Sequence, residues 1–331
     1  MQQNTFSIAE VEKAIKDGRT LLIAGEEALL QALPQGKWVG GTIPYFVSPD
    51  KGGEVNKEQV FVTDISEVAA SITVGVYTQD TLGKVYTDED GCGFSFIIVP
   101  AASEVHASFA VNGPNYKDFG SRPLIGWVSG VHLDDLGKVT PKVFDGITGK
   151  SFEQEAVVMH VMLPAGKSVD VGIINLFEQG EGDVLTFATD GFAATEVMVN
   201  GVKENFADYI TKNNLDTKLP LVADYYGAMV NISFQSVEPG GEVKLYAPVF
   251  SGIRYKHAQA VSNYGEAFSD QLKKNSPDAN SVAFSCNCIL NYLYSGLEGN
   301  KTDPFVGPVT FGEIAYQLLN QTLVYLEVHD N

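Results

Sequence analysis

The middle of the chain is a succession of short apolar runs separated by turn residues, and this pattern limits the fold more than any other feature. The runs recur from residue 60 to about residue 190, with Gly, Asp and Lys between them: QVFVTDI, ASITVGVYT, GFSFIIVPA, PLIGWVSGVHL, AVVMHVML, SVDVGIINLF and DVLTFAT. Short strands at this spacing are typical of antiparallel sheets rather than of repeated strand–helix–strand units. We therefore predict a mixed α/β (α+β) fold with mainly antiparallel sheets flanked by helices.

The ends of the chain add helices and a division into two domains. Ser7 and Glu10 have the spacing of a capping box, which predicts a helix that ends at Gly18. The acidic, glycine-containing stretch EQGEGD predicts a boundary between residues 180 and 195. A chain of 331 residues is long enough for about two domains. We expect one domain over residues 1–190 and a second over 191–331.

One order of elements occurs twice in the sequence. A strand at 21–25, a helix at 26–33 and the residues Val39-Gly40-Gly41-Thr42 are echoed near the C-terminus. There a strand at 282–285 and a helix at 289–294 precede Val306-Gly307-Pro308. We expect a pseudo-repeat, with one copy of this unit in each domain.

The charge of the chain excludes some classes of partner. Forty-one acidic residues oppose 22 basic ones, which gives a net charge of -19. A protein of this charge repels nucleic acid and anionic lipid. The first residues lack a signal-peptide pattern, and no run approaches the roughly 20 apolar residues of a membrane span. We therefore expect a cytoplasmic protein that binds neither nucleic acid nor membrane.

Two of the three cysteines, Cys286 and Cys288, lie in the stretch AFSCNCILNYLY. Residues two apart in a strand point to the same face, so one metal ion could reach both. Structural zinc needs four ligands, and Cys92 and the five histidines do not provide a second pair at ligand spacing. We expect no metal and no cofactor. Cys286 is either a nucleophile that has a base nearby in space or a small buried side chain, and we favour burial.

The stretch VTFGEIAY places a carboxylate directly after a glycine at the end of a strand. Gly312 would allow close approach of the backbone, and Glu313 would face a bound amine or hydroxyl group. The alternative is a bulged strand with a solvated glutamate. In either case we expect Glu313→Gln to change the stability by less than about 1 kcal/mol. Gly40-Gly41-Thr42 and the His132, Asp134, Asp135 cluster fit a kinked strand and a solvated turn better than binding sites.

Read together, the C-terminal residues resemble the FIST family of sensory domains over about 195–328. The matching pieces are VMVNGVKENFADYI, VEPGGEVKLYAPV, SVAFSCNCIL, GPVTFGEIAY and NQTLVYLEV, and the N-terminal half matches only through WVGGTIPY. Gly312-Glu313 and Asn320-Gln321-Thr322 are the most specific parts. The chain departs from the family where an Arg or Gly often follows the Ser-Cys step, because Asn287, Cys288 and Ile289 stand there.

The resemblance implies a sensor-type protein that binds a small, amino-acid-like ligand. The chain ends at Asn331 without an output domain, so we expect a separate signalling protein as its partner. No catalytic residue is expected. Two alternatives remain open: a hydrolase that uses Glu313 or Cys286, and a pure protein-interaction module. The expected ligand-binding residues are Ser285, Cys286, Asn287, Cys288, Thr310, Gly312 and Glu313.

Overall fold

The computed structural model describes residues 3–89, 91, 93–225, 227–238 and 241–331. The fold is α+β with mostly antiparallel sheets, as the sequence predicts. The chain forms two compact units. Unit 1 contains residues 1–174, 272–318 and 322–331, and unit 2 contains residues 175–271 and 319–321.

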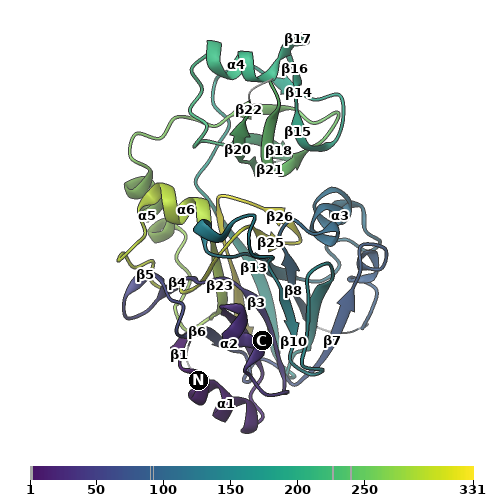
Figure 1. The fold of residues 1–331 in the computed structure, drawn as a ribbon, viewed down its shortest axis with the longest axis vertical. Coiled ribbons are helices and arrows are strands. Elements are labelled where there is room, and N and C mark those ends of the chain that lie inside the picture. The colour runs from purple at the N-terminus through teal and green to yellow at the C-terminus, as the bar shows by residue number, and fades with distance from the viewer. Residues whose placement is uncertain (1–2, 90, 92, 226, 239–240) are drawn as a thin grey trace. The chain divides into compact units, whose positions relative to one another are not determined.

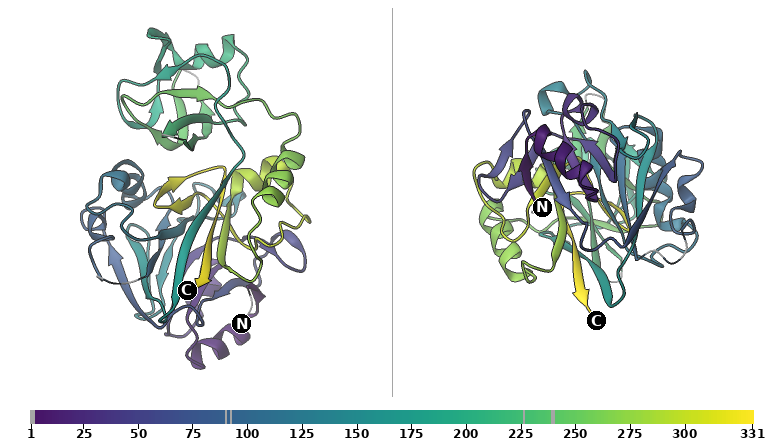
Figure 2. Two further views of the ribbon diagram at one scale, coloured as in Figure 1. Left: turned by 180° about the vertical axis from the view of Figure 1, so that it is seen from behind. Right: turned by 90° about the horizontal axis from the view of Figure 1, so that it is seen from below.

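Unit 1 holds three six-stranded sheets. Across the first sheet, the strands are β1 (Asn4–Phe6), β6 (Val60–Asp64), β2 (Leu21–Gly25), β3 (Trp38–Thr42), β10 (Val143–Asp145) and β11 (Lys150–Phe152). Across the second, they are β7 (Ser71–Tyr77), β12 (Ala156–Met162), β8 (Phe94–Pro100), β9 (Leu124–Ser129), β25 (Glu313–Ala315) and β26 (Gln317–Leu319). Across the third, they are β13 (Lys167–Asn175), β27 (Thr322–Asp330), β23 (Val282–Cys288), β24 (Gly307–Thr310), β4 (Tyr45–Ser48) and β5 (Gly52–Val55). Figure 2 shows β27, coloured yellow, as it leads to the C-terminus.

The three sheets are built on one plan. Each contains one parallel pair of strands joined by a helix, and these pairs are β2–β3, β8–β9 and β23–β24. The joining helices are α2 (Glu27–Gln31), α3 (Glu104–Asn112) and α6 (Ile289–Ser295). Each sheet also receives a hairpin from another repeat: β10–β11 joins the first sheet, β25–β26 the second and β4–β5 the third. Unit 1 is therefore an internal threefold repeat whose members exchange hairpins in a cycle.

A glycine marks the same place in all three repeats. Gly40, Gly126 and Gly307 stand in the second strand of each parallel pair, where they face Phe144, Ile314 and Val47 of the incoming hairpin. A Cβ atom on them would lie 2.8, 1.7 and 1.9 Å from a carbonyl oxygen of the preceding parallel strand. Only glycine permits so close an approach. This shared steric requirement supports the threefold register independently of the strand order.

The echo seen in the sequence is therefore real, but its copies are not divided between two domains. Val39-Gly40 and Val306-Gly307 match as expected, and both lie in unit 1. The expected boundary at 190/191 falls inside unit 2. The reason is strand pairing over long sequence distances, since β24 pairs with β4 and β25 pairs with β9. Unit 2 is an insertion in the chain between β13 and β23 of the third repeat.

The core of unit 1 has an inner and an outer part. In the inner part, Trp127 of β9 stacks on Phe284 of β23, and Phe96 of β8 meets both rings edge-on. In an outer cluster, α1 (Ile8–Lys16) and α2 pack on the first sheet through Val11, Ile15 and other apolar residues. The predicted capping box opens α1, because Glu10 accepts a hydrogen bond from the Ser7 amide. Figure 1 shows both helices next to the strands of this sheet.

Unit 2 has its own sheets and a small core. One sheet contains β17 (Val202–Asn205), β16 (Glu196–Val199), β14 (Leu185–Thr186), β22 (Tyr255–His257), β18 (Leu221–Tyr225) and β19 (Ala228–Ile232). The other contains β15 (Gly191–Ala194), β21 (Val243–Val249) and β20 (Phe234–Val237).

The remaining helices of the chain are α4 (Phe206–Lys212), α5 (Tyr264–Lys274) and the 3-10 turns η1 (Leu82–Lys84), η2 (Gly113–Asn115) and η3 (Leu133–Asp135). No helix in the described ranges has the length and apolar character needed to cross a membrane.

Candidate functional site

Four of the seven expected site residues meet inside unit 1. Cys286 and Cys288 alternate with Ser285 and Asn287 along β23, so the two thiols point to one face of the strand, as predicted. Phe284 shares that face and stacks on Trp127, which places the face in the inner core. Thr310 ends β24 and Glu313 begins β25, and both contribute to the same cluster.

Glu313 lies where the chain passes from the third sheet to the second. The chain leaves β24 at Thr310, and Glu313 pairs with Trp127 of β9. The matching hairpin positions in the other repeats are Val143, opposite Gly41, and Phe46, opposite Pro308. Both are fully buried apolar residues, and Glu313 is also 0% exposed. The alternative of a solvated glutamate is therefore wrong, because this position belongs to the core in every repeat.

Hydrogen bonds surround the Glu313 carboxyl group. Thr322 donates to Oε2 from its hydroxyl group at 2.8 Å and from its amide at 3.3 Å. The Thr310 hydroxyl lies 3.5 Å from Oε1. Burial nevertheless dominates and raises the pKa of Glu313 to about 8. The side chain is therefore mostly a neutral acid at pH 7, in contact with hydroxyl and thiol groups.

The two thiols are buried and form no disulfide. Cys286 and Cys288 are 2% and 1% exposed, and the Cys286 sulfur lies 3.6 Å from the Gly126 carbonyl oxygen. Burial, with a smaller contribution from Glu313, raises the pKa of Cys286 well above its usual value. A protonated thiol is a poor nucleophile. This favours the interpretation of Cys286 as a buried side chain over its interpretation as a nucleophile.

Ser285 and Asn287 lie on the opposite face of β23 from the thiols. Asn287 accepts hydrogen bonds from Asn291 of α6 and from the Cys288 amide, and Ser285 donates to the Val306 carbonyl oxygen. The Asn287 bonds hold the start of α6 against the strand, and the Ser285 bond joins β23 to the residue before β24. A cavity of about 10 Å³ borders this face, which is room for one water molecule. Gly312 is buried between Thr310 and Glu313, and its carbonyl oxygen accepts from the Val128 amide and the Thr310 hydroxyl. The expected residues are thus buried on different sides of β23 and do not line one ligand pocket.

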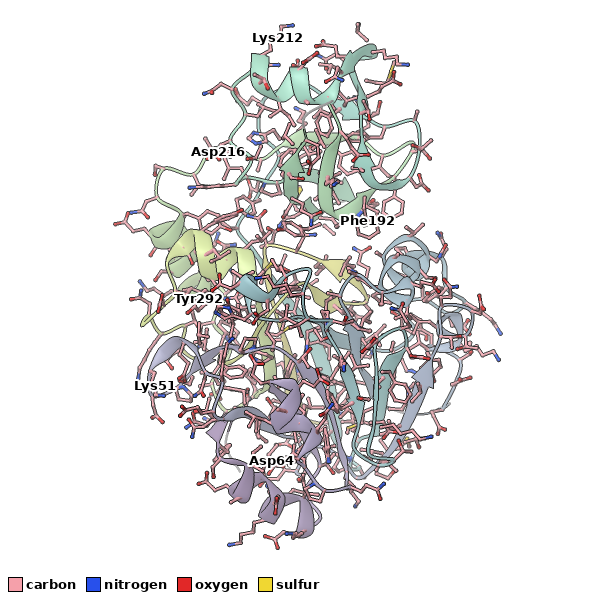
Figure 3. All side chains as sticks on the ribbon, in the orientation of Figure 1. Lys51, Asp64, Phe192, Lys212, Asp216 and Tyr292 are labelled. Atoms are coloured by element: carbon pink, nitrogen blue, oxygen red, sulfur yellow. The ribbon has the colours of Figure 1, made fainter. Side chains whose placement is uncertain are left out.

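A much larger groove lies at the other end of β23. It has a volume of about 1060 Å³ and is bordered by Val282 and Ala283 at the start of that strand. Other parts of unit 1 contribute its charged residues, which are Arg19, Asp64, Glu67, Lys167, Asp303 and Asp330. Figure 3 labels Asp64, which ends β6 on the first sheet. The groove is mainly polar, so it suits a hydrophilic ligand.

Two ion pairs border the groove. The Arg19 guanidinium lies 2.6 Å from Asp64, whose side chain is fully buried. Burial acts to raise the pKa of Asp64, but hydrogen bonds from Ser66 and Arg19 outweigh it and the pKa is lowered. Lys167 lies 2.7 Å from the exposed Asp330. Both cations keep about a third of their side-chain surface exposed, so they remain accessible to a ligand.

Sequence reasoning missed the residues of this groove, and it also missed a buried histidine. The groove residues come from both ends of the chain and from β13, so no local pattern joins them.

His160 lies in the apolar strand β12, between Ser95 and Tyr77. Its signal was present in the sequence, since one histidine interrupts the apolar run AVVMHVML. A polar residue in such a run needs buried partners.

The Asn320-Gln321 segment has a structural role within unit 2. The Ser233 hydroxyl lies within hydrogen-bond distance of the side-chain oxygens of Asn320 and Gln321, and Asn231 donates to both of their backbone carbonyl oxygens. Gln321 in turn donates to the Lys218 carbonyl oxygen. Asn320 and Gln321 are 2% and 1% exposed. This network fastens the short return segment 319–321 to the rest of unit 2.

The described residues contain no group of three or more His, Cys, Asp or Glu side chains that could hold a metal ion. Cys92 lies outside the described residues. Asp134 and Asp135 form the turn η3, where Asp135 pairs with Lys57 and His132 stacks on Tyr45. The interpretation of this cluster as a solvated turn fits the 91% exposure of the Asp134 side chain.

A family model describes nearly the whole chain, since it matches residues 6–329. The chain belongs to DUF6976, a family of unknown function. No curated protein matches the chain. The likeness of this DUF6976 member to FIST domains stays a prediction. The strand and the helix quoted for that likeness are β16 and α4, and the Asn200-Gly201 turn follows β16. A further strand, β17, lies between the turn and the helix.

Proposed function

We propose that this DUF6976 protein is a sensor-type binding protein that holds a small polar ligand in the groove at the start of β23. The observation that carries the proposal is the groove itself, with its volume of about 1060 Å³ and its charges of both signs. We place the ligand in this groove and not at Ser285–Cys288 and Glu313, as the sequence led us to expect, because those residues are buried. β23 extends from the groove to the Glu313 cluster.

The groove favours an amino-acid-like ligand. Arg19 and Lys167 can each donate to a ligand carboxylate while they keep their own carboxylate partners. Glu67 and Asp303 also border the groove, and neither has a cationic partner among the described residues. They can accept hydrogen bonds from a ligand ammonium group. With four acidic and two basic side chains, the groove disfavours ligands that carry only negative charge.

We also propose that the protein is cytoplasmic and that it acts through a separate signalling protein. Cys286 and Cys288 form no disulfide, which suits a reducing compartment. The net charge of -19 suits solubility and disfavours nucleic acid and anionic lipid as partners.

A thermal-shift screen followed by calorimetry tests the proposal. Amino acids, organic acids, diamines and nucleotides are screened first, because a ligand that binds only the folded state raises the melting temperature. For the best ligand we expect Lys167→Gln to weaken binding tenfold to a hundredfold, as for a lost charge-assisted hydrogen bond of roughly 1.5–3 kcal/mol. Lys203→Gln is the matched control, since Lys203 forms a similar exposed ion pair with Glu196 in unit 2, at 2.6 Å. If the two variants bound the ligand with equal affinity, the ligand would not bind in the groove.

A further inference from the structure

A chain of four hydrogen-bonded side chains crosses the second sheet of unit 1. The Ser95 hydroxyl of β8 lies 2.8 Å from Nδ1 of His160 on β12. Nε2 of His160 lies 2.9 Å from the Tyr77 hydroxyl of β7, and Tyr77 donates to Asp88 at 3.2 Å. Ser95, His160 and Tyr77 are 1%, 2% and 5% exposed. Asp88 is partly exposed and connects the buried members to the surface.

The directions of these hydrogen bonds determine which imidazole nitrogen of His160 carries a proton. Tyr77 uses its only proton toward Asp88, so its oxygen accepts from Nε2–H of His160. Nδ1 then carries no proton and accepts from the Ser95 hydroxyl. His160 is therefore neutral in this arrangement. Burial, with a smaller contribution from Arg122, lowers the pKa of His160 to about 4, and Asp88 opposes this effect.

The segment that carries Asp88 is held by hydrogen bonds and by buried side chains, and one of these bonds runs from the Tyr86 hydroxyl to the Tyr316 carbonyl oxygen. Arg122, which precedes β9, donates to the carbonyl oxygens of Val85, Asp88 and Glu89. Leu82 and Val85 of the same segment are fully buried. The charged groups that act on the Tyr77–His160 pair are Asp88 and Glu89 on this segment and Arg122 on the neighbouring one. We call residues 82–89 the latch segment.

We propose that Ser95, His160, Tyr77 and Asp88 form an acid-sensitive latch that releases the latch segment when His160 gains a proton. Protonation would put a proton on Nδ1, so Ser95 could no longer donate there and would have to accept instead. It would also place a buried cation near the partly buried Arg122. Opening of the segment admits water to the imidazolium and exposes the apolar side chains of Leu82 and Val85. This adds regulation by pH to the binding protein and does not depend on the identity of its ligand.

Hydrogen exchange of the latch segment at several pH values tests the proposal, after correction for the intrinsic exchange rate. The released histidine has the ordinary pKa of about 6.5 and the latched one a pKa of about 4. Linkage then makes the opening constant rise about 25-fold between pH 7.5 and pH 5. We expect this rise in the wild type and its absence in His160→Gln, whose side chain is neutral at both pH values.

Two controls keep the test specific. His329→Gln changes a partly exposed histidine and should retain the wild-type rise. Peptides from α3 carry His106, whose pKa burial also lowers to about 4, so they report any general effect of acid. These peptides should exchange alike in the wild type and in His160→Gln. A rise of the same size in His160→Gln, or no rise in the wild type, would overturn the proposal.

A second measurement covers the case in which His160→Gln does not fold. Nitrogen-15 NMR of the wild type distinguishes the two imidazole nitrogens. We expect the proton on Nε2 at pH 7.5, and a neutral ring for as long as the latch segment remains protected. A proton on Nδ1 at pH 7.5, or titration of the latched ring near pH 6.5, would refute the latch.

Discussion

The substitution Glu313→Gln tests whether the buried carboxyl group of Glu313 is protonated in the folded protein. Burial raises the pKa of Glu313 to about 8 from 4.5, so the folded protein keeps a proton that the unfolded chain releases. This proton stabilises the fold fully below pH 4.5, and the contribution is lost as the pH rises through 8. At about 1.36 kcal/mol for each pKa unit, the difference of 3.5 units amounts to at most about 5 kcal/mol.

The pH window for this test follows from the other buried groups. His106 and His160 have pKa values lowered to about 4, so they make the stability rise with pH up to about 6.5 and oppose Glu313 there. Between pH 6.5 and pH 8, Glu313 acts without them. Urea unfolding of the wild type should lose about 2 kcal/mol over this window, from 1.5 units at 1.36 kcal/mol each.

Glutamine has the shape of the neutral acid and cannot ionise, so Glu313→Gln should abolish the decline. At pH 7 the variant should be about 3 kcal/mol more stable than the wild type, provided that it keeps the Thr322 bonds. This replaces the expectation of a change below 1 kcal/mol, which assumed a surface residue. The exposed Glu298→Gln is the control and should decline like the wild type. An equal decline in Glu313→Gln would mean that ionisation of Glu313 does not cause the decline. A wild-type stability that is constant over this window would mean that Glu313 has no raised pKa in the folded protein.

Two further predictions concern the core of unit 1. In a Cys92→Ser background, the thiols of Cys286 and Cys288 should not react with a thiol reagent until urea unfolds the protein, because both are buried and burial raises the pKa of Cys286. Rapid labelling of the native protein would contradict this. Gly126→Ala should cost about 3 kcal/mol or more in urea unfolding, since its Cβ would lie 1.7 Å from the Ile97 carbonyl oxygen. Gly182→Ala has open space around it and should stay within about 0.5 kcal/mol, and equal effects of the two substitutions would count against the strand register.

Local pattern predicted much of the fold, because most strands here carry their own apolar runs. The runs around Ile97 and His160 are strands β8 and β12, and the capping box at Ser7 opens α1. The helix α3 was missed, although Ser103 caps it by accepting from the His106 amide. Without α3, the third copy of the repeat was hidden, and only two copies could be found.

Pairing over long sequence distances could not be predicted. The hairpin β4–β5 pairs with β24, and Val47 and Gly307 come together from opposite ends of the chain. The same exchange buries Glu313, whose local sequence resembles an exposed strand end. The groove has the same origin, because Arg19 and Lys167 meet only in the folded unit. Sequence reasoning therefore found the Glu313 cluster as a chemical feature and misjudged its exposure.

A crystal structure with the best ligand of the thermal-shift screen tests the central claim most directly. The claim is that the groove of unit 1 binds a small polar molecule and leaves it unchanged. We expect density for the intact ligand beside Arg19 and Lys167, with its ammonium group toward Glu67 or Asp303. Density for a cleaved ligand, or for a ligand bound anywhere outside the groove, would contradict it.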